Sequence, residues 1–270
     1  MISVIISTFN APERLEKVLW GYFAQTMKDF EIVIADDGST EETAQLIRSF
    51  QEETGMKLLH VWHADEGFRK TVILNKAIQV SSGDYLVFTD GDCVPRKDFV
   101  NMHAKIARPG CFLTGTYYMM SAQTSRATNR EVILSGDCFS PCWLLVHGFT
   151  AARTLLKFSL PWLLTSIADR FTRHPTHWPG CNASAWRNDI VEVNGFNEEM
   201  GYGAEDSEFG VRLLNLGLHC IKVRSRAVVL HLEHGRSYAD EEIMRQNELI
   251  VKNVEKSKII RCTNGLVNDK

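Results

Sequence analysis

Two aspartates separated by a single glycine, Asp90 and Asp92, have the residue types and spacing needed to bind a divalent cation. They follow the apolar run Leu86–Phe88, which is typical of a buried strand in a parallel sheet. In open α/β sheets, ligands bind beyond the carboxyl ends of the strands, where these acids would lie. Hard oxygen ligands at this spacing suit Mg²⁺ or Mn²⁺ shared with a diphosphate. An Asp–Gly turn that merely closes a strand is the alternative interpretation.

A second pair of acids, Glu205 and Asp206, stands at the predicted start of a helix. The helix dipole and the free backbone N–H groups favour a carboxylate at this position. Gly201, Tyr202 and Gly203 precede the acids and form a flexible wall with an aromatic ring, which suits a sugar site. One aspartate here could take the proton of an acceptor hydroxyl. A plain acidic first turn is the alternative.

Two histidines, His231 and His234, follow a predicted strand three residues apart. One of them could join Asp92 on a single cation, because imidazole is a common metal ligand. For each histidine, an ordinary surface or core position is the alternative.

Strands and helices alternate four times over the first 90 or so residues, which predicts a parallel sheet with right-handed crossovers. The loops after the strands, STFN, ADDGST, HADEGFRK and TDGDC, are polar or acidic and should meet at one edge of the sheet. A nucleotide site there is the simplest use of them. The chain has neither GxGxxG nor a Walker lysine loop, so it fits neither a dinucleotide-binding fold nor a P-loop NTPase.

The later elements are predicted from apolar spacing and from capping residues. We expect helices over residues 95–107 and 238–256, an amphipathic helix after Asp206, a strand over 111–119, a strand region over 221–230 and a loose tail.

The stretch 139–171 is dense in Leu, Phe and Trp, is broken by Pro141 and Pro161, and is edged with basic residues. One interpretation is a buried pair of helices. The other is an amphipathic element at a membrane surface, with its basic residues facing anionic lipid. The interleaving of aromatic and basic residues favours the second.

The composition is that of an ordinary soluble globular protein, with 44% hydrophobic and 23% charged residues among 270. A formal net charge of −3 argues against a general nucleic-acid binder. Seven cysteines without CxxC spacing are read as reduced thiols of a cytosolic protein. No signal peptide and no membrane-spanning stretch are recognised, so we expect a cytoplasmic protein, peripheral at the inner face of the membrane if 139–171 is interfacial.

Several motifs together resemble known families. ISTFNAPERL, FEIVIADDGST and FTDGDCVP resemble glycosyltransferase family 2, whose nucleotide-sugar fold is called GT-A. The stretch from WPGCNAS through NGFNEEMGYGAEDSEFGVRLLNLG resembles the acceptor-side module of β-1,4-galactosyltransferases and of bacterial chondroitin-type polymerases. GFRKTVILNKAI resembles both groups. The resemblance covers about residues 1–235, and the ordered set is specific although no single motif is.

On the donor side, the resemblance implies roles for residues near the nucleotide. Ser7 and Thr8 would line it, and Asp37 would read uracil. Arg69 or Lys70 would face the uridine or the diphosphate.

On the metal and acceptor side, the resemblance makes Asp90 and Asp92 the Asp-x-Asp metal motif, with Asp92 the direct ligand. His231 matches the metal-binding histidine. Asp206 matches the catalytic base, and Glu205 the neighbour that holds the acceptor sugar. Tyr202 stands where the galactosyltransferase motif has Trp, so the stacking wall differs here.

The resemblance therefore implies an α/β GT-A fold with a mostly parallel central sheet flanked by helices and a C-terminal helical extension. Residues 1–120 would bind the donor, 121–237 would bind the acceptor and supply the base, and 238–270 would form a helix and tail of the same compact domain. The implied enzyme is an inverting transferase that uses Mn²⁺ or Mg²⁺ and a UDP-sugar. Its acceptor would be a glycan of the bacterial surface, such as a polysaccharide or lipopolysaccharide that is still lipid-linked.

Two other functions compete with this one. A sugar-phosphate nucleotidyltransferase would need a glycine-rich, basic loop after the first strand, which ISTFNAPERL does not provide. A non-catalytic glycan- or membrane-binding module on the same fold would not need Asp90, Asp92, Asp206 and His231 together.

Overall fold

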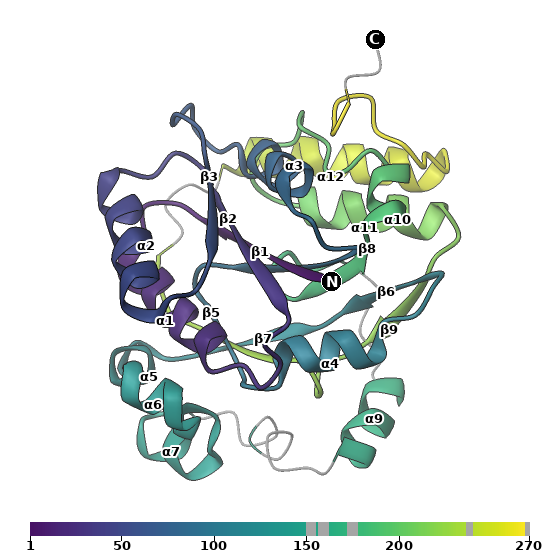
Figure 1. The fold of residues 1–270 in the computed structure, drawn as a ribbon. Coiled ribbons are helices and arrows are strands. Elements are labelled where there is room, and N and C mark those ends of the chain that lie inside the picture. Colours follow the sequence, from purple (N-terminus) through teal and green to yellow (C-terminus); the bar gives the residue numbers. More distant parts are fainter. Residues whose placement is uncertain (150–154, 156–161, 172–177, 236–239, 268–270) are drawn as a thin grey trace.

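The computed structural model describes residues 1–149, 155, 162–171, 178–235 and 240–267 (Figure 1). In chain order, the strands are β1 (Ile2–Thr8), β2 (Phe30–Asp36), β3 (Leu58–Trp62), β4 (Tyr85–Asp90), β5 (Cys93–Pro95), β6 (Cys111–Thr114), β7 (Thr116–Met119), β8 (Ala183–Trp186), β9 (His219–Lys222) and β10 (Val228–His231). The α-helices are α1 (Pro12–Phe23), α2 (Glu41–Thr54), α3 (Lys70–Val80), α4 (Phe99–Ile106), α5 (Ala122–Ala127), α6 (Arg130–Ser135), α7 (Pro141–Val146), α9 (Trp162–Phe171), α10 (Arg187–Glu192), α11 (Glu205–Asn215) and α12 (Glu241–Lys256), with a 3₁₀ turn η1 (Asp137–Phe139) before α7.

Within the described residues, seven strands form the central sheet in the order β3-β2-β1-β4-β8-β6-β9. The first four strands of this order are parallel, β8 runs antiparallel to both of its neighbours, and β6 and β9 are parallel. The carboxyl ends of β1, β2 and β4 therefore meet at one edge, because Ser7 lies beside both Ala35 and Asp90. The predicted mostly parallel α/β sheet is confirmed.

A small second sheet, β5-β10-β7, lies beyond the carboxyl end of β4. In its antiparallel pair, His231 of β10 stands opposite Cys93 of β5. Since Cys93 directly follows Asp92, this register brings the end of β10 to the Asp-x-Asp turn.

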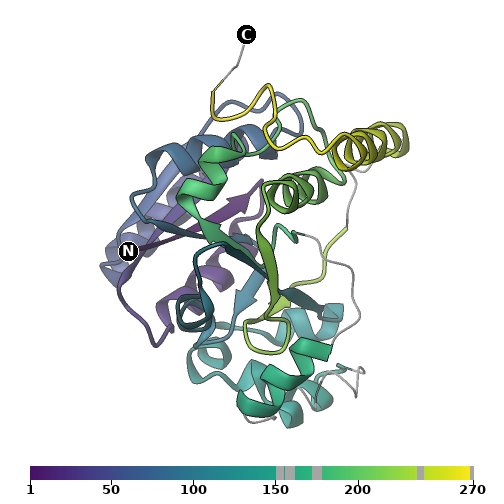
Figure 2. The same ribbon diagram turned by 90° about the vertical axis from the view of Figure 1, so that its right-hand side faces the viewer.

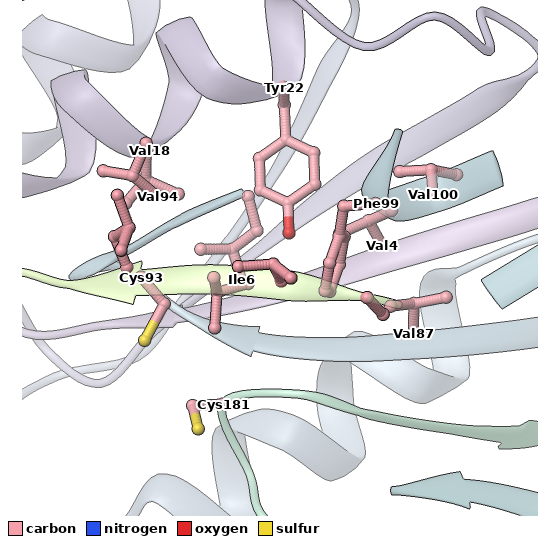
Figure 3. Close-up of a cluster of buried hydrophobic side chains, with 14 of the residues drawn as sticks. Val4, Ile6, Val18, Tyr22, Val87, Cys93, Val94, Phe99, Val100 and Cys181 are labelled. Atoms are coloured by element: carbon pink, nitrogen blue, oxygen red, sulfur yellow. The ribbon is translucent and has the colours of Figure 1, made fainter. Parts of the chain in front are cut away.

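Successive side chains along the strands of the central sheet point to opposite faces, and each face packs into its own hydrophobic core. Val4 and Ile6 face α1, α2 and α4, in a cluster that contains Tyr22 and Phe99 (Figure 3). Ile5 faces the other way, toward α3, α10 and α11. Figures 1 and 2 show the sheet between these two layers, with α12 lying along α11. The central strands β1 and β4 are thus buried on both faces, as their continuous apolar runs predict.

Three expected elements differ in their bounds. The helix expected over 95–107 begins only at Phe99, because residues 93–95 pair with β10. The strand expected over 111–119 is split at Gly115 into β6 and β7, which belong to different sheets. The close approach of Asn182 explains the break, since a Cβ on Gly115 would lie 2.2 Å from its Cγ.

The strand region expected over 221–230 is likewise two strands, β9 and β10. The turn between them is closed by hydrogen bonds from the N–H groups of Arg226 and Ala227 to the carbonyl of Val223. The start expected for the last helix, residue 238, lies outside the described residues, and α12 is described from Glu241.

The expectation of a loose tail is wrong up to residue 267. Cys262 is buried, and the side chain of Asn194 donates to the carbonyls of Cys262 and Val267. These bonds hold the segment after α12 against the turn that precedes α11. All seven cysteines carry free thiols.

The stretch 139–171 contains α7 and α9, while residues 150–154 and 156–161 lie outside the described residues. In the described part of the chain, no helix combines the length and the apolar character needed to cross a bilayer.

Candidate active site

Asp90 ends β4 and is held in place by two neighbours. The hydroxyl of Ser7 donates to Asp90 Oδ1 over 2.7 Å, and Lys70 Nζ lies 2.9 Å from the same oxygen. Gly91 then lets the chain pass close to β1, where its N–H donates to the carbonyl of Ser7 over 2.7 Å. A Cβ on Gly91 would lie only 3.0 Å from that carbonyl oxygen, so the Asp-x-Asp turn is fixed by its glycine.

Asp92 faces both histidines. His234 Nε2 lies 2.8 Å from Asp92 Oδ2, and His231 Nε2 lies 3.5 Å from Asp92 Oδ1. The two rings stack with their centroids 5.3 Å apart. The structure therefore brings Asp92 and His231 together as the sequence predicts, and it adds His234, which the sequence pattern alone leaves open between a ligand and an ordinary surface or core residue.

The chemistry of this trio fits a divalent cation. In each histidine, Nδ1–H donates to a backbone carbonyl, of Leu232 for His231 and of Gly235 for His234. Nε2 of each ring is thereby directed at Asp92, and such outer hydrogen bonds are typical of metal-ligating histidines. Without a cation, His234 needs a second proton to meet the carboxylate, and its hydrogen bond to Asp92 raises the pKa of His234. Three ligand atoms from these residues lie within 4.8 Å of one another.

A second group of possible ligands consists of Asp90, Cys93 and Cys181. Both thiols lie in the apolar cluster of Figure 3, and burial raises the pKa of Cys93 well above its usual range. A neutral thiol is a poor ligand, and thiolates select softer metals than Mg²⁺ or Mn²⁺. The oxygen and imidazole donors around Asp92 are the better fit to a hard cation.

Lys70 lies between the Asp-x-Asp turn and the two acids at the start of α11. It stands at the first position of α3, bonded to Asp90, and is close enough to Asp206 and Glu205 for their charges to act on it. Burial alone would lower the pKa of Lys70, but the charges of these three acids outweigh it and hold the pKa well above its usual range. Lys70 is therefore a fixed cation between the Asp-x-Asp turn and the start of α11.

Asp206 is held by a backbone group from a distant segment. Its Oδ2 accepts a hydrogen bond of 2.9 Å from the N–H of Gly180, whereas its Oδ1 is buried without a hydrogen-bond partner among the described residues. Burial raises the pKa of Asp206 to about 7, helped by the charges of Glu205 and Asp90 and opposed by Lys70. A carboxyl group with this pKa can accept a proton near neutral pH.

Glu205 and Tyr202 form the wall beside Asp206. Glu205 is buried, and its Oε2 accepts a hydrogen bond of 2.8 Å from the N–H of Gly203. The ring of Tyr202 meets that of Phe68 edge to face, with centroids 5.4 Å apart. Phe68 lies in the GFRK motif, so one aromatic contact joins the loop before α3 to the loop before α11.

Asp37 follows β2 with both carboxylate oxygens bonded to this chain. His63 Nε2 lies 2.7 Å from Oδ1, and the N–H of Arg69 donates to Oδ2 over 3.0 Å. Lys76 Nζ lies 3.3 Å from His63 Nδ1, which leaves the proton on Nε2 to face Asp37. Burial raises the pKa of Asp37, and the bond from His63 opposes that rise.

Thr8 and Arg69 complete the set of predicted residues. Thr8 is buried at the end of β1, and its Oγ1 has no hydrogen-bond partner among the described residues. The guanidinium of Arg69 pairs with Glu66 at the surface. Among the described residues, Lys70 and not the Arg69 side chain is therefore the cation paired with Asp90.

Sequence reasoning missed the positioning residues Gly180 and His63. A Cβ on Gly180 would lie 2.4 Å from Asp206 Oδ2, so this position requires glycine. The WPGCNAS motif contains Gly180, but nothing in the motif indicates that its N–H reaches residue 206.

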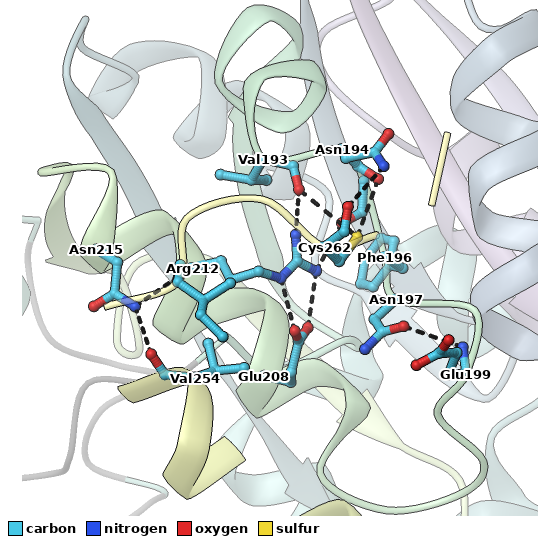
Figure 4. Close-up of polar contacts among 12 residues, drawn as sticks. Val193, Asn194, Phe196, Asn197, Glu199, Glu208, Arg212, Asn215, Val254 and Cys262 are labelled. Atoms are coloured by element: carbon cyan, nitrogen blue, oxygen red, sulfur yellow. Dashed lines mark hydrogen bonds and ion pairs between the residues drawn. The ribbon is translucent and has the colours of Figure 1, made fainter. Parts of the chain in front are cut away.

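The helix that carries Asp206 is anchored by a buried ion pair (Figure 4). Arg212 Nε donates to Glu208 Oε1 over 2.8 Å, one turn apart on α11. The guanidinium also donates to the carbonyls of Val193 and Gly195. Both side chains are almost fully buried, so a partner left alone would carry an uncompensated charge. These bonds fix α11 relative to the preceding turn.

Two family models match the chain. Glycosyl transferase family 2 matches residues 3–155, and the N-terminal domain of galactosyltransferase matches residues 167–235. The first region contains the Asp-x-Asp turn and Lys70. The second contains Gly180, Asp206 and both histidines. The resemblance inferred from the motifs is confirmed.

Two curated relatives are about a quarter identical to this chain over the residues that align. A validoxylamine A glucosyltransferase of Streptomyces hygroscopicus subsp. jinggangensis is 27% identical over 79% of this chain and 51% of its own length. The chondroitin synthase of Pasteurella multocida is 25% identical over 80% of this chain and 23% of its own length. The chain thus spans about half the length of the first of these relatives and about a quarter of the second.

Solved structures with the same fold include S. aureus TarS 1-349 in complex with UDP-GlcNAc, with a TM-score of 0.63, 16% identity and coverage of 96% of this chain and 70% of that one. The mannosyltransferase PcManGT from Pyrobaculum calidifontis, in complex with GDP-Man and Mn²⁺, has a TM-score of 0.60, 19% identity and coverage of 88% and 58%. These likenesses show a GT-A-like fold. Because the family 2 model matches more than half of the sequence, and because its motif acids meet at one edge of such a sheet, this chain belongs to glycosyltransferase family 2.

Proposed function

We propose that this protein is an inverting, metal-dependent glycosyltransferase that moves a hexosyl or N-acetylhexosaminyl group from a UDP-sugar to a hydroxyl of a glycan. The observation that carries the proposal is the position of Lys70. It is bonded to Asp90 of the Asp-x-Asp turn and lies within the electrostatic influence of Asp206 and Glu205. The proposed donor and acceptor groups therefore belong to one continuous site.

In this proposal Asp206 is the general base. The Gly180 N–H fixes one carboxylate oxygen, and the other has no competing partner among the described residues. With a pKa of about 7, Asp206 is partly ionised at neutral pH and can take the acceptor proton as the new bond forms. Direct attack by the acceptor on the side opposite the leaving group is a single displacement, which inverts the configuration of the transferred sugar.

Asp92, His231 and His234, with Asp90 beside them, would hold Mn²⁺ or Mg²⁺. When bound, such a cation stabilises the charge that develops on the departing diphosphate. Lys70 supplies a fixed positive charge beside Asp90 in the protein itself. The Mn²⁺ in the mannosyltransferase complex supports a divalent metal in this fold.

The remaining donor contacts are assigned to Ser7, Thr8, Asp37 and Arg69. We propose the same division as in the sequence analysis, with residues 1–120 for the donor, 121–237 for the acceptor and the base, and 238–270 as a helix and tail. The UDP-GlcNAc in the TarS complex supports a uridine nucleotide as donor.

The acceptor is proposed to be a bacterial surface glycan that is still lipid-linked. The named activities of the relatives, among them chondroitin synthase, hyaluronan synthase and a teichuronic acid biosynthesis glycosyltransferase, support a polysaccharide product. The chain covers only part of the length of these relatives. Their polysaccharide acceptors are therefore assigned to this chain only as part of the proposal.

We also propose that α9 contacts an anionic membrane surface. Among the side chains of α9 that the structure describes, from residue 164 on, the buried ones are polar. Thr165 and Asp169 are buried one turn apart, and Asp169 accepts hydrogen bonds from the Ser225 N–H and from Arg226 Nε, both at 2.8 Å. Three large apolar side chains face outward beside the exposed Arg170, with exposed fractions of 47% for Leu164, 48% for Ile167 and 76% for Phe171. Surface helices of globular proteins normally have the opposite arrangement.

The helix α7 also exposes apolar side chains. Leu144 is buried, whereas Leu145 and Val146 are exposed. Between Cys138 and Cys181 the only acidic residue is Asp169, which is paired with Arg226. The same stretch contains four residues with a permanent positive charge, Arg153, Lys157, Arg170 and Arg173. Apolar and basic side chains together suit a bilayer that contains anionic lipid.

The test is hydrolysis and transfer with a panel of UDP-sugars, with and without Mn²⁺, and with GDP-mannose for comparison. We expect Mn²⁺-dependent release of UDP from at least one UDP-sugar, and loss of that activity with EDTA. UTP with sugar 1-phosphates is assayed in parallel. Pyrophosphate release in that arm, without turnover of any UDP-sugar, would replace the proposal with a nucleotidyltransferase.

A further inference from the structure

The loop before α11, residues 201–204, is held by one side chain of α12 and is here called the acceptor loop. Asn247 is buried, with 3% of its surface exposed. Its Nδ2 lies 3.0 Å from the carbonyl oxygen of Gly201, 3.3 Å from that of Tyr202 and 2.6 Å from that of Gly203. An amide nitrogen has two hydrogens, so these three carbonyls share one donor group.

The backbone of the acceptor loop also lies directly against α12. A Cβ on Gly201 would lie 2.9 Å from Ile243 Cγ2, and a Cβ on Gly203 would lie 2.7 Å from Met244 Cγ. Gly203 and Ala204 both have positive φ, 97° and 64°. For alanine this conformation is unfavourable and persists only where the surroundings hold it.

The acceptor loop in turn fixes the two acids at the start of α11. The N–H of Gly203 donates to Glu205 Oε2, and Asp206 is the next residue. A shift of the loop carbonyls would therefore rotate the first turn of α11 and move both carboxylates.

We propose that Asn247 is a positioning residue of the transferase, which holds the acceptor loop so that Tyr202, Glu205 and Asp206 face the acceptor sugar. The role of Asn247 in catalysis rests on the proposed function, whereas its contact with the acceptor loop does not. This role extends the site to α12, which lies beyond the regions that the two family models match.

The chain offers a matched control at the other end of the same helix pair. Asn215, at the end of α11, donates from Nδ2 to the carbonyls of Val254 and Ile259, at 3.1 and 2.8 Å. Asn247, in the first half of α12, thus joins that helix to the loop before α11, and Asn215 joins the ends of the two helices, so the helices run parallel. Loss of the Asn215 amide weakens the same packing without touching the acceptor loop.

The experiment compares Asn247→Ala, Asn247→Asp and Asn215→Ala in the full chain. Hydrogen exchange read by mass spectrometry should show exchange at least about ten-fold faster at residues 201–206 in both Asn247 variants, and unchanged there in Asn215→Ala. Transfer to a panel of p-nitrophenyl glycosides should lose about 10- to 100-fold in kcat/KM for the acceptor. The KM for the donor should be unchanged.

Each other outcome has one meaning. Unchanged exchange at residues 201–206 would overturn the inference, and so would faster exchange with normal acceptor kinetics. Equal kinetic losses in Asn215→Ala would reduce the effect to general packing. If the wild-type protein turns over no nucleotide sugar, the proposed function fails, and exchange alone then decides whether Asn247 holds the loop.

Discussion

The N–H of Gly180 donates a hydrogen bond of 2.9 Å to Asp206 Oδ2, across 26 residues of sequence. The two residues belong to separate segments that both follow the basic, apolar stretch 139–171. Gly180 lies just before β8, and Asp206 lies in the first turn of α11. The contact sets the orientation of the proposed base, because only one oxygen of the carboxylate is then left for an acceptor.

Gly180→Ala is expected to lower the rate of transfer by about 100-fold, since an added Cβ would lie 2.4 Å from Asp206 Oδ2 and would displace it. The affinity for the donor should change little. Gly217→Ala, at the opposite end of α11, is the control. Its φ of 96° makes the alanine cost about 1 kcal/mol of stability, but no atom of the described residues lies within 4 Å of the new Cβ. Normal transfer by Gly180→Ala would show that its N–H does not position the base.

Asp206→Asn should keep the affinity for the UDP-sugar and lose turnover by about 10²–10⁴, the usual contribution of a general base. Isothermal calorimetry measures the first quantity, and transfer to a true acceptor measures the second. Near-normal turnover would move the base to Glu205 or elsewhere. Loss of donor binding would instead assign Asp206 to the metal-binding residues.

The pH dependence follows from the pKa of about 7 for Asp206. Only the ionised form can accept a proton, so kcat/KM for the acceptor should rise with pH up to about 7 and then level off. The charged groups that act on Asp206 are Lys70, Glu205 and Asp90. A profile that is already flat from pH 5 would contradict the assignment.

Ionisation of Asp206 should lower the stability of the folded protein as pH rises, whereas it should raise the rate of transfer. Because the pKa is higher in the folded than in the unfolded chain, the folded state loses relative stability as pH rises from about 4 to 7. Asp206→Asn should therefore raise the unfolding free energy at pH 8, on the order of 1–3 kcal/mol, and less at pH 5. Thermal unfolding at the two pH values measures this without any substrate.

The metal assignment predicts that Asp92→Ala, His231→Ala and His234→Ala each weaken Mn²⁺-dependent UDP binding by at least about ten-fold. His219→Ala, an exposed histidine on β9, serves as the control. Calorimetry with Mn²⁺ and UDP is the measurement. Unchanged affinity in Asp92→Ala and His231→Ala would remove the site. Unchanged affinity in His234→Ala alone would restrict the set to the residues named from the sequence, Asp90, Asp92 and His231.

The membrane proposal predicts co-sedimentation of the protein with vesicles that contain anionic lipid, weakened by added salt. The double variant Ile167→Glu with Phe171→Glu should lose this binding. Leu249→Glu is the control, because Leu249 is also exposed, at 59%, but lies on α12 and not on α9. This variant should retain vesicle binding. A folded wild-type protein that ignores such vesicles would contradict a membrane role for α9.

Local sequence determined the edge of the sheet at which the Asp-x-Asp turn lies. The apolar run before Asp90 and the glycine after it are sufficient for a strand that ends in an acidic turn, because both features act over a few residues. The alternation of strands and helices then determined the parallel order, since short crossovers allow few other arrangements. The family motifs added the roles of Asp206 and His231 as expectations.

Tertiary structure decided which distant groups meet these residues. Whether His234 faces Asp92 depends on the pairing of β5 with β10, and the strand expected over 111–119 breaks where Asn182 comes within 2.2 Å of the place a Cβ of Gly115 would take. The contacts of Asp206 with Gly180 and of the acceptor loop with Asn247 involve single backbone groups. Backbone N–H and C=O groups occur at almost every residue, so no pattern of side-chain types identifies which of them lies within 3 Å of a given carboxylate or amide until the chain is folded.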